Sequence, residues 1–194
     1  DTLLDYVGVK SPQFSFSRLK GTDPVLGVEM ASTGEVACFG DDVEEAFLKS
    51  LISTGFSIPK KNILVSISGD KHRFRLLDDV KKLSELGFTL YGTESTSAFY
   101  RDQGIPMGQL YKIHEEKEPN ILTFMVEGKL DLVISMPDKK EVSISEKTDT
   151  AIIRRQAVEH AIPLLNDVLL AKLFVKAIAE KKLEHLEIKA WGEY

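Results

Sequence analysis

Ile63-Leu64-Val65-Ser66-Ile67 is the stretch on which the fold prediction depends. It is an almost continuous apolar run, as expected for a short strand that is covered on both faces. Apolar residues then recur at helical spacing from Phe74 to Leu86, and Gly87 ends this stripe. A strand that leads into a helix in this way predicts one unit of a parallel sheet.

The same alternation continues to the end of the chain. Further strands are predicted at 88–91, 109–113, 130–135 and 162–166. Helices are predicted at 95–103, from Pro119 to Gly128, from an N-cap at Asp149 to His160, and at 168–182, with a polar loop over 136–148. The pattern therefore predicts an α/β fold, a parallel five-stranded sheet with helices on both faces.

Residues 1–40 have a different character. Short strands are predicted at 7–9 and 13–16, and residues 25–39 are rich in Gly, Ser and Thr without helical periodicity. Asp41 and Asp42 then precede an amphipathic helix that ends near Gly55, and residues 58–61 resemble a linker. We therefore divide the chain into residues 1–40, residues 41–61 as a helix and linker, and residues 62–194.

Composition excludes several classes of protein. The 25 basic and 30 acidic residues give a net charge of −5, the wrong sign for a protein that grips nucleic acid mainly through its phosphates. No apolar run approaches the roughly 20 residues of a membrane-spanning helix. The single cysteine, Cys38, cannot form an internal disulfide, and no signal-peptide pattern opens the sequence, so we expect a cytoplasmic protein. The start at Asp1 without Met suggests a piece of a longer chain.

The end of the second predicted strand has the residues of a phosphate-binding turn. Gly92-Thr93-Glu94-Ser95-Thr96 runs directly into a predicted helix. Glycine permits close approach, and hydroxyls together with the free N–H groups of a helix start are typical partners of an anion. The alternative is that Thr93 or Ser95 simply caps the helix, which Ser and Thr commonly do.

Other strand ends carry similar residues. In an open parallel sheet ligands bind beyond the carboxyl ends of the strands, so these residues are expected to meet at one edge. Taken singly, each lysine is more simply explained as a solvated surface charge, but the gathering predicts an anion site. The candidate residues are Ser66, Lys71, Thr93, Ser95, Thr96, Lys112, Ser135, Lys139 and Lys140.

Motifs of several enzyme and metal classes are absent from the sequence. It contains no Walker A loop, no GxGxxG fingerprint and no GxSxG elbow. The histidines His72, His114, His160 and His185 are scattered, without the spacing of a zinc site. We therefore predict no metal ligands in this chain.

Residues 12–19 and 23–36 carry a more specific signal. The second stretch contains Glu29-Met30-Ala31-Ser32-Thr33-Gly34-Glu35-Val36. Together they closely resemble the end of the second ATP-grasp half of the carbamoyl phosphate synthetase large-subunit family. The remaining chain is similar to the part that follows in that family, a linking helix and a C-terminal regulatory domain of the methylglyoxal synthase-like fold. The resemblance implies that residues 1–40 are part of an ATP-grasp domain.

The resemblance also implies what the longer protein does. That family makes carbamoyl phosphate from bicarbonate, glutamine-derived ammonia and two ATP, with Mg or Mn, for pyrimidine and arginine synthesis. Its nucleotide- and metal-binding carboxylates lie upstream of the position where this chain begins, which implies that this chain holds no catalytic residues and needs no cofactor of its own. The implied partners are the remainder of the large subunit, a glutamine amidotransferase subunit or domain, and further copies in a homo-oligomer, with no nucleic acid and no membrane.

Effector binding is the role that the resemblance implies for residues 62–194. The family's effectors are small anions, among them UMP, IMP, UTP, phosphoribosyl pyrophosphate and N-acetylglutamate. The matching positions are Ser66, Lys71, Thr93, Thr96 and Lys112, with Ser135 where asparagine is usual. Ser11 stands where the family's ornithine site has an acidic residue, so ornithine activation is not predicted.

Two alternatives to a regulatory module remain open from the sequence. A methylglyoxal synthase-like phosphate lyase would need a carboxylate base, and the family's G-G-D-x-Q segment has no counterpart, which leaves Glu115 or Asp138 as substitutes. A structural or oligomerisation module without a ligand is the other alternative.

Overall fold

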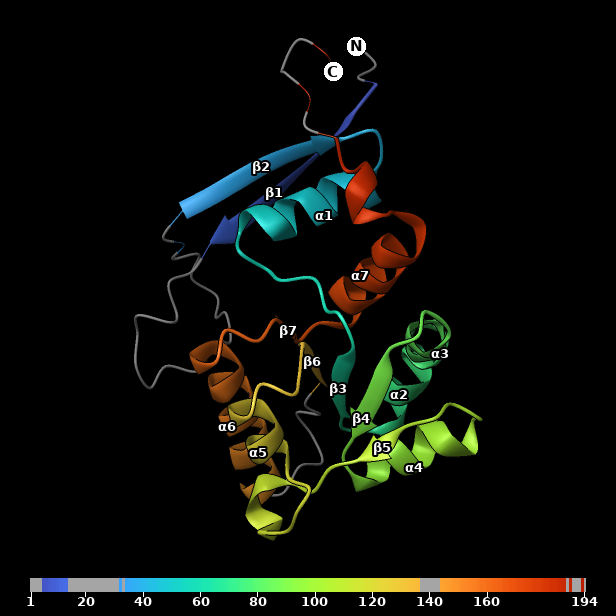
Figure 1. Ribbon diagram of the computed structural model, residues 1–194, viewed down its shortest axis with the longest axis vertical. Helices are drawn as coiled ribbons and strands as arrows, with labels where there is room; N and C mark the ends of the chain where they lie inside the picture. The colour runs from blue at the N-terminus through green and yellow to red at the C-terminus, as the bar shows by residue number, and fades with distance from the viewer. Residues whose placement is uncertain are drawn as a thin grey trace.

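β3 (Asn62–Ile67) lies at the centre of a five-stranded parallel sheet in the computed structural model of the chain (Figure 1). The structure describes residues 5–13, 32, 34–136, 144–187, 189 and 193, with residues 144–148 described only as part of a helix. The strand order is β5-β4-β3-β6-β7. The other strands are β4 Thr89–Gly92, β5 Gly108–Gln109, β6 Leu132–Met136 and β7 Leu164–Leu165. The predicted α/β fold is confirmed.

Helices cover both faces of this sheet. They are α1 Val43–Ser53, α2 Asp70–Arg75, α3 Leu77–Glu85, α4 Glu94–Asp102, α5 Ile121–Val126, α6 Ile144–Glu159 and α7 Val168–Glu180, with 3₁₀ turns η2 Ile113–Glu115 and η3 Leu183–His185. Ile63, Val65 and Ile67 pack on one face with residues of α3, α4 and α7. Leu64 packs on the opposite face with residues of α5 and α6. Two cores therefore bury β3 from both sides.

Local element boundaries differ from the prediction at several places. The stripe from 74 to 86 belongs to two helices, because the chain leaves helical geometry at Leu76 (φ −105°, ψ 10°) between α2 and α3. The strand predicted at 109–113 is only Gly108–Gln109. As an edge strand it pairs with β4 alone, and the chain then turns into η2, where the Glu115 carboxylate accepts a hydrogen bond from the Lys112 N–H at 2.6 Å.

Asp149 is not the N-cap that the sequence predicts. α6 begins at Ile144, so Asp149 lies inside the helix, and its carboxylate is paired with the His114 imidazole. The predicted loop over 136–148 is therefore wrong from 144 onward, while residues 137–143 lie outside the described part of the chain. Hydrophobic periodicity indicates a helix only where apolar residues recur, and residues 145–148 are all polar, so the first turn of this helix has no apolar stripe.

β1 (Val7–Gln13) and β2 (Gly34–Gly40) form a separate two-stranded antiparallel sheet. α1 packs on one face, where the Ser11 Oγ donates to the Ser50 Oγ at 3.0 Å. The tight turn from β2 into α1 requires Gly40, since a Cβ there would lie 2.6 Å from the Ala46 nitrogen. The rest of the strand predicted at 13–16, and nearly all of 23–33, lie outside the described residues.

The first turn of α1 is held as predicted. The Asp42 side chain accepts a hydrogen bond from the Glu45 N–H at 2.9 Å, which makes Asp42 the N-cap, and the Glu45 carboxylate accepts from the Asp41 N–H at 2.9 Å.

No helix among the described residues has both the length and the apolar character needed to cross a membrane.

α7 joins the two-stranded sheet and its helix to the five-stranded sheet (Figure 1). It packs against α1 and also against α3. Lys176 pairs with Glu44 in the first turn of α1, and Lys181, the C-cap of α7, pairs with Asp42, the N-cap of α1. Lys172 pairs with Asp79 of α3 at 3.2 Å. Charged contacts thus connect α7 to both of its neighbours.

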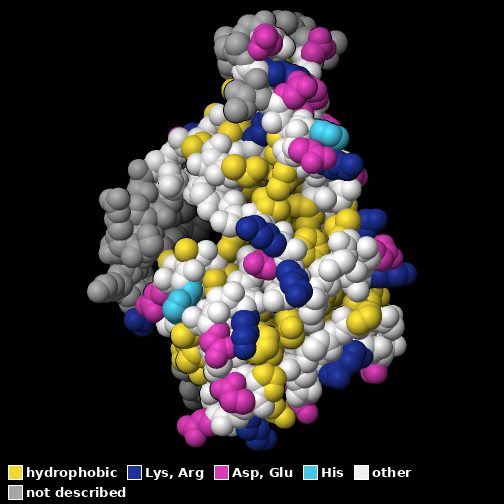
Figure 2. All heavy atoms as spheres, in the orientation of Figure 1, with side chains coloured by type: hydrophobic (Ala, Val, Ile, Leu, Met, Phe, Trp, Pro, Cys, Tyr) yellow, Lys and Arg dark blue, Asp and Glu magenta, His cyan; other side chains and the backbone are white. Residues whose placement is uncertain are grey.

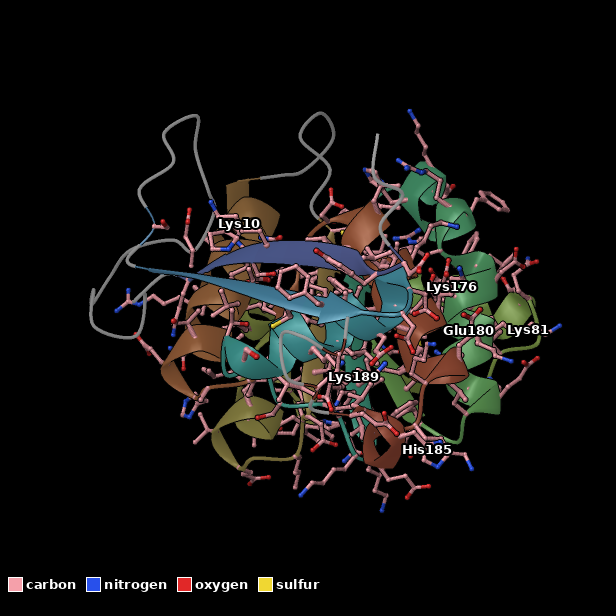
Figure 3. All side chains as sticks on the ribbon, turned by 90° about the horizontal axis from the view of Figure 1, so that it is seen from above. Lys10, Lys81, Lys176, Glu180, His185 and Lys189 are labelled. Atoms are coloured by element: carbon pink, nitrogen blue, oxygen red, sulfur yellow. The ribbon has the colours of Figure 1, made fainter. Side chains whose placement is uncertain are left out.

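These contacts shift the titration of the carboxylates. The hydrogen bond from Lys176 holds the pKa of Glu44 below its ordinary value, and the hydrogen bond from Lys181 does the same for the pKa of Asp42. Glu44 in turn raises the pKa of Lys176, to which Glu180 also contributes from the next turn of α7 (Figure 3).

The Glu44→Gln substitution tests this junction. Because the pKa of Glu44 is lowered in the folded state, its ionised form stabilises the fold above its ordinary pKa of 4.5, and this stability is lost as the pH falls through the lowered value. We expect E44Q to reduce the free energy of unfolding at pH 7 by about 0.5–1 kcal/mol, since the partner lysine is half exposed. Urea denaturation at pH 7 and pH 3 measures this.

Glu85→Gln is the matched control, because Glu85 faces Lys82 at 3.8 Å with both side chains about half exposed. Its unfolding should be nearly unchanged at both pH values. A difference between E44Q and the unsubstituted chain that persists at pH 3 would contradict the assignment.

Candidate anion site

Three hydroxyl residues lie side by side at the carboxyl ends of adjacent strands. β3 lies between β4 and β6, with Val65 registered to Gly92 and Ser66 registered to Ser135. Thr93 directly follows Gly92, so Thr93, Ser66 and Ser135 occupy the ends of three neighbouring strands. We call these residues, together with Thr96 and the first turn of α4, the strand-end site.

Ser135 carries a buried hydroxyl without a partner. Its side chain is 0% exposed, and its Oγ finds no hydrogen-bond partner in the described structure. Ser66 and Ser135 lie on the face of α5 and α6, because each is two residues after a residue of that core, Leu64 and Val133 respectively, and such residues share one face of a strand. Buried polar atoms are nearly always hydrogen-bonded, so this oxygen is an exception among the described residues.

The first turn of α4 has no side-chain cap. Thr93 is the N-cap residue, with extended geometry (φ −66°, ψ 164°), but its hydroxyl donates to the Thr96 Oγ1 at 3.2 Å. Ser95 is exposed and does not cap the helix either. Thr93 therefore occupies the N-cap position, as the alternative predicted, but neither hydroxyl makes the capping hydrogen bond. The N–H groups at the start of α4 keep their capacity to bind an anion.

Thr96 has a structural task. It is fully buried, and its Oγ1 accepts from the Ile67 N–H at 3.3 Å and donates to the Ile67 carbonyl at 3.1 Å. These two bonds join the start of α4 to the end of β3. Thr96 therefore holds the strand-end site together instead of offering a free hydroxyl.

Gly92 permits the close approach of α4 to the sheet. A Cβ at this position would lie 2.8 Å from the Met107 Sδ and 3.2 Å from both the Ser97 nitrogen and the Val65 carbonyl oxygen. Two of these atoms belong to backbone, which has little room to move. The glycine of the predicted phosphate-binding turn is thus required by packing.

Arg73 is a residue of this region that the sequence analysis missed. Its guanidinium donates to the Ser95 Oγ at 2.9 Å, to the Ile67 carbonyl at 3.1 Å and to Asp70 at 2.9 Å. The side chain is only 12% exposed. In the sequence Arg73 stands in an ordinary charged segment, where the i,i+3 spacing from Asp70 signals a local ion pair but not its contacts with β3 and α4.

Lys112 lies at the start of η2, between β5 and α5. The Asn120 side-chain amide donates to the Lys112 carbonyl at 3.2 Å. Two residues later, His114 pairs through Nδ1 with Asp149 of α6, whose side chain is 7% exposed. The segment that carries Lys112 is therefore held to α6, a contact that no local pattern indicated.

The remaining predicted lysines are less constrained. Lys71 is exposed in the first turn of α2, which follows β3. Lys139 and Lys140 lie outside the described residues, as does Asp138. Within the described ranges no group of three or more His, Cys, Asp or Glu side chains could hold a metal ion.

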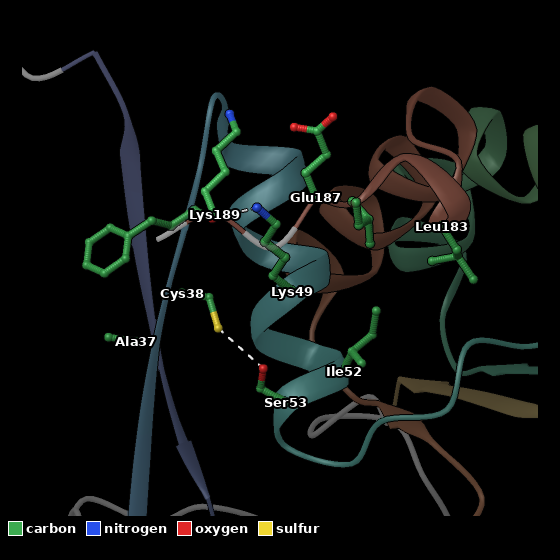
Figure 4. Close-up of a pocket in the computed structure, with 10 residues that line it drawn as sticks. Ala37, Cys38, Lys49, Ile52, Ser53, Leu183, Glu187 and Lys189 are labelled. Atoms are coloured by element: carbon green, nitrogen blue, oxygen red, sulfur yellow. Dashed lines mark hydrogen bonds between the residues drawn. The ribbon is translucent and has the colours of Figure 1, made fainter. Parts of the chain in front are cut away.

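A hollow of about 550 Å³ lies away from the strand-end site, between β2, α1 and the segment after α7 (Figure 4). Cys38 and Ser53 line it, with their Sγ and Oγ atoms 3.4 Å apart.

Acidic and basic side chains are interspersed over the face shown in Figure 2, without a large patch of one sign. This face therefore carries no extended basic surface.

Thr96→Val tests the join between α4 and β3. The substitution keeps the side-chain volume and removes both hydrogen bonds to Ile67, so we expect the free energy of unfolding to fall by about 1–3 kcal/mol. Chemical denaturation measures the change. Thr89→Val, at an exposed position of β4, is the control and should change it little. Equal stability of the two variants would exclude this role for Thr96.

The chain is similar in sequence to a known domain family and to several known proteins. Residues 75–166 match the family model described as MGS-like domain. Multifunctional protein pyr1-3 of Dictyostelium discoideum is 47% identical over 182 residues, which cover 92% of this chain and 8% of that protein. Multifunctional protein CAD of Squalus acanthias is 45% identical over 184 residues, covering 89% of this chain and 8% of that protein.

Mitochondrial carbamoyl-phosphate synthase (ammonia) of Homo sapiens is 40% identical over 182 residues, covering 92% of this chain and 12% of that protein. The chain thus spans only about a tenth of the length of these relatives. A solved methylglyoxal synthase from Elizabethkingia anophelis NUHP1 superposes with a TM-score of 0.49 at 17% identity, over 61% of this chain and 79% of that chain. Residues 75–166 therefore match the MGS-like domain model, within a chain that is similar along most of its length to segments of carbamoyl-phosphate synthase and of multifunctional proteins.

Proposed function

We propose that this chain is the C-terminal regulatory region of a carbamoyl-phosphate synthase large subunit, and that a small anionic effector binds at the strand-end site. The effector class is a nucleotide such as UMP or IMP, or an acidic molecule similar to N-acetylglutamate. Binding would tune synthesis of carbamoyl phosphate by the longer protein, which would use ATP with Mg or Mn, bicarbonate and ammonia delivered by a glutamine amidotransferase.

One observation carries this proposal: the uncapped start of α4 follows the carboxyl end of β4, and the buried, unpartnered hydroxyl of Ser135 lies near the carboxyl end of β6, two strands away at the same edge of the sheet. The N–H groups of α4 and the positive end of its dipole favour a negative group at this position. Ser66 adds a further hydroxyl from the neighbouring strand end. An effector with a phosphate or carboxylate would supply acceptors to all of these donors at once.

The lyase alternative receives less support from the geometry. Such a lyase would need a carboxylate placed as a base beside the phosphate. Glu115, one of the two candidates, accepts the Lys112 N–H at 2.6 Å and is thereby committed to the start of η2. Formation of methylglyoxal from dihydroxyacetone phosphate by the chain would reverse this preference.

Regulation requires that the effector binds two states of the synthase with different affinity. The strand-end site lies at the edge of the five-stranded sheet, and α3 packs on that sheet. α7 packs against α3 and also against α1, so it connects the sheet to α1. An effector that alters the end of β3 would therefore act on a set of packed helices that extends to α1, which precedes β3 in the chain.

Calorimetry with UMP, IMP, UTP, phosphoribosyl pyrophosphate and N-acetylglutamate tests the binding proposal on the chain itself. We expect at least one of them to bind with a dissociation constant below 1 mM, the threshold that this test sets. Thr93→Val should weaken that binding by about 10-fold or more, since a hydrogen bond to a charged group is lost. Thr89→Val, exposed at the other end of β4, should bind as the unsubstituted chain does. No heat from any of the five compounds at millimolar concentration would refute the proposal.

A further inference from the structure

The side chain of Arg73 occupies a position that is unfavourable for a cation. It donates to the Ser95 Oγ at 2.9 Å, so its positive charge lies at the N-terminal end of α4. The helix dipole has its positive end there, and cations are normally favoured at the opposite end. The side chain is also removed from water, with 12% of it exposed. A buried cation at this position needs negative charge close to it.

Asp70 supplies only part of that charge. It contacts the Arg73 Nη1 at 2.9 Å, but its own side chain is 72% exposed. Water screens an exposed carboxylate, so the pair contributes little. The other two acceptors of the guanidinium, the Ser95 hydroxyl and the Ile67 carbonyl, are neutral.

The guanidinium is held rigidly by its surroundings. Tyr100, which is fully buried, donates through its hydroxyl to the Arg73 carbonyl at 3.2 Å, and burial raises the pKa of that phenol. The Arg73 Nε and the Thr96 hydroxyl both donate to the same Ile67 carbonyl. Arg73 and the strand-end site therefore share one anchoring atom.

We propose that Arg73 is the fixed positive charge of the strand-end site and positions Ser95 and the first turn of α4 around the bound anion. This inference rests on the proposed function, because it assigns a charge to that same site. The electrostatic cost of a buried cation at a helix N-terminus is then offset when a phosphate or carboxylate arrives.

Asp70 allows a test that a purely structural role would fail. Removing the charge of Asp70 should strengthen binding of any nearby anion, because a like charge is removed. If Arg73 also serves as a charge for the anion, Asp70 competes with the ligand for it, so the gain from Asp70→Asn should be smaller when Arg73 is replaced by Met.

The experiment measures binding of inorganic phosphate to the chain by calorimetry at low ionic strength. We expect D70N to bind phosphate about threefold more tightly, because the repulsion between the Asp70 carboxylate and the phosphate is removed. The size of this effect assumes an effective dielectric constant between that of the protein surface and that of water. Arg73→Met should bind about 10-fold more weakly or worse, and Arg73→Lys should lie between, since it keeps the charge without the fork of donors. The gain with D70N and the losses with R73M and R73K should all become smaller at high salt concentration.

Arg101→Met is the matched control. Arg101 lies in the last turn of the same helix and also hydrogen-bonds a serine, with its Nη2 2.9 Å from the Ser97 Oγ. Removing this arginine should leave phosphate binding unchanged. Thermal denaturation of each variant checks folding, and if R73M does not fold, D70N and R73K decide the outcome.

The two proposals can fail separately. Absence of phosphate binding by the unsubstituted chain, together with no binding of the nucleotide and acylated effectors, would overturn the proposed function and this inference with it. Binding that Thr93→Val abolishes but that D70N, R73K and R73M leave unchanged would overturn only the role of Arg73. Weaker binding by D70N, or a gain from D70N that is equally large when Arg73 is replaced by Met, would likewise overturn it.

Discussion

Burial of β3 from both sides is the constraint on which the rest of the structure depends. Its side chains alternate between two apolar cores, and its backbone pairs in parallel with β4 and β6. Parallel pairing brings the carboxyl ends of these strands to one edge. Thr93 and Ser135, which are far apart in the sequence, thereby become neighbours across Ser66. The candidate anion site is thus a consequence of how the sheet is buried.

The end of β3 illustrates how stability and binding share the same atoms. Beyond Ile67 the strand does not continue its ladder with β4, and its last amide and carbonyl bond instead to Thr96, with Arg73 as a second donor to the carbonyl. On the other side Ser68 remains joined to β6 through the Met136 carbonyl at 2.9 Å. Polar groups that satisfy the strand end also shape the surface that an anion would meet, so changes at one affect the other.

Much of the fold could be predicted from periodicity and end signals. The apolar run at Ile63, the stop at Gly87 and the N-cap at Asp42 depend on local chemistry, and each lies where it was expected. The errors occur where tertiary contacts override local pattern. Asp149 resembles an N-cap in sequence, yet it lies inside α6, where its carboxylate pairs with His114. β5 is short because an edge strand has a partner on one side only.

The chain's own residues were enough to define the fold class and to name the strand ends at which an anion site would form, because hydrophobic period and turn chemistry are local properties. They could not reveal that the Thr96 hydroxyl is committed to Ile67, that the Ser135 hydroxyl is buried without a partner, or that Arg73 lies at the start of α4. Each of these facts depends on groups from different strands and helices meeting in space. Hydrogen bonding across such distances is settled only when the two cores close around the sheet.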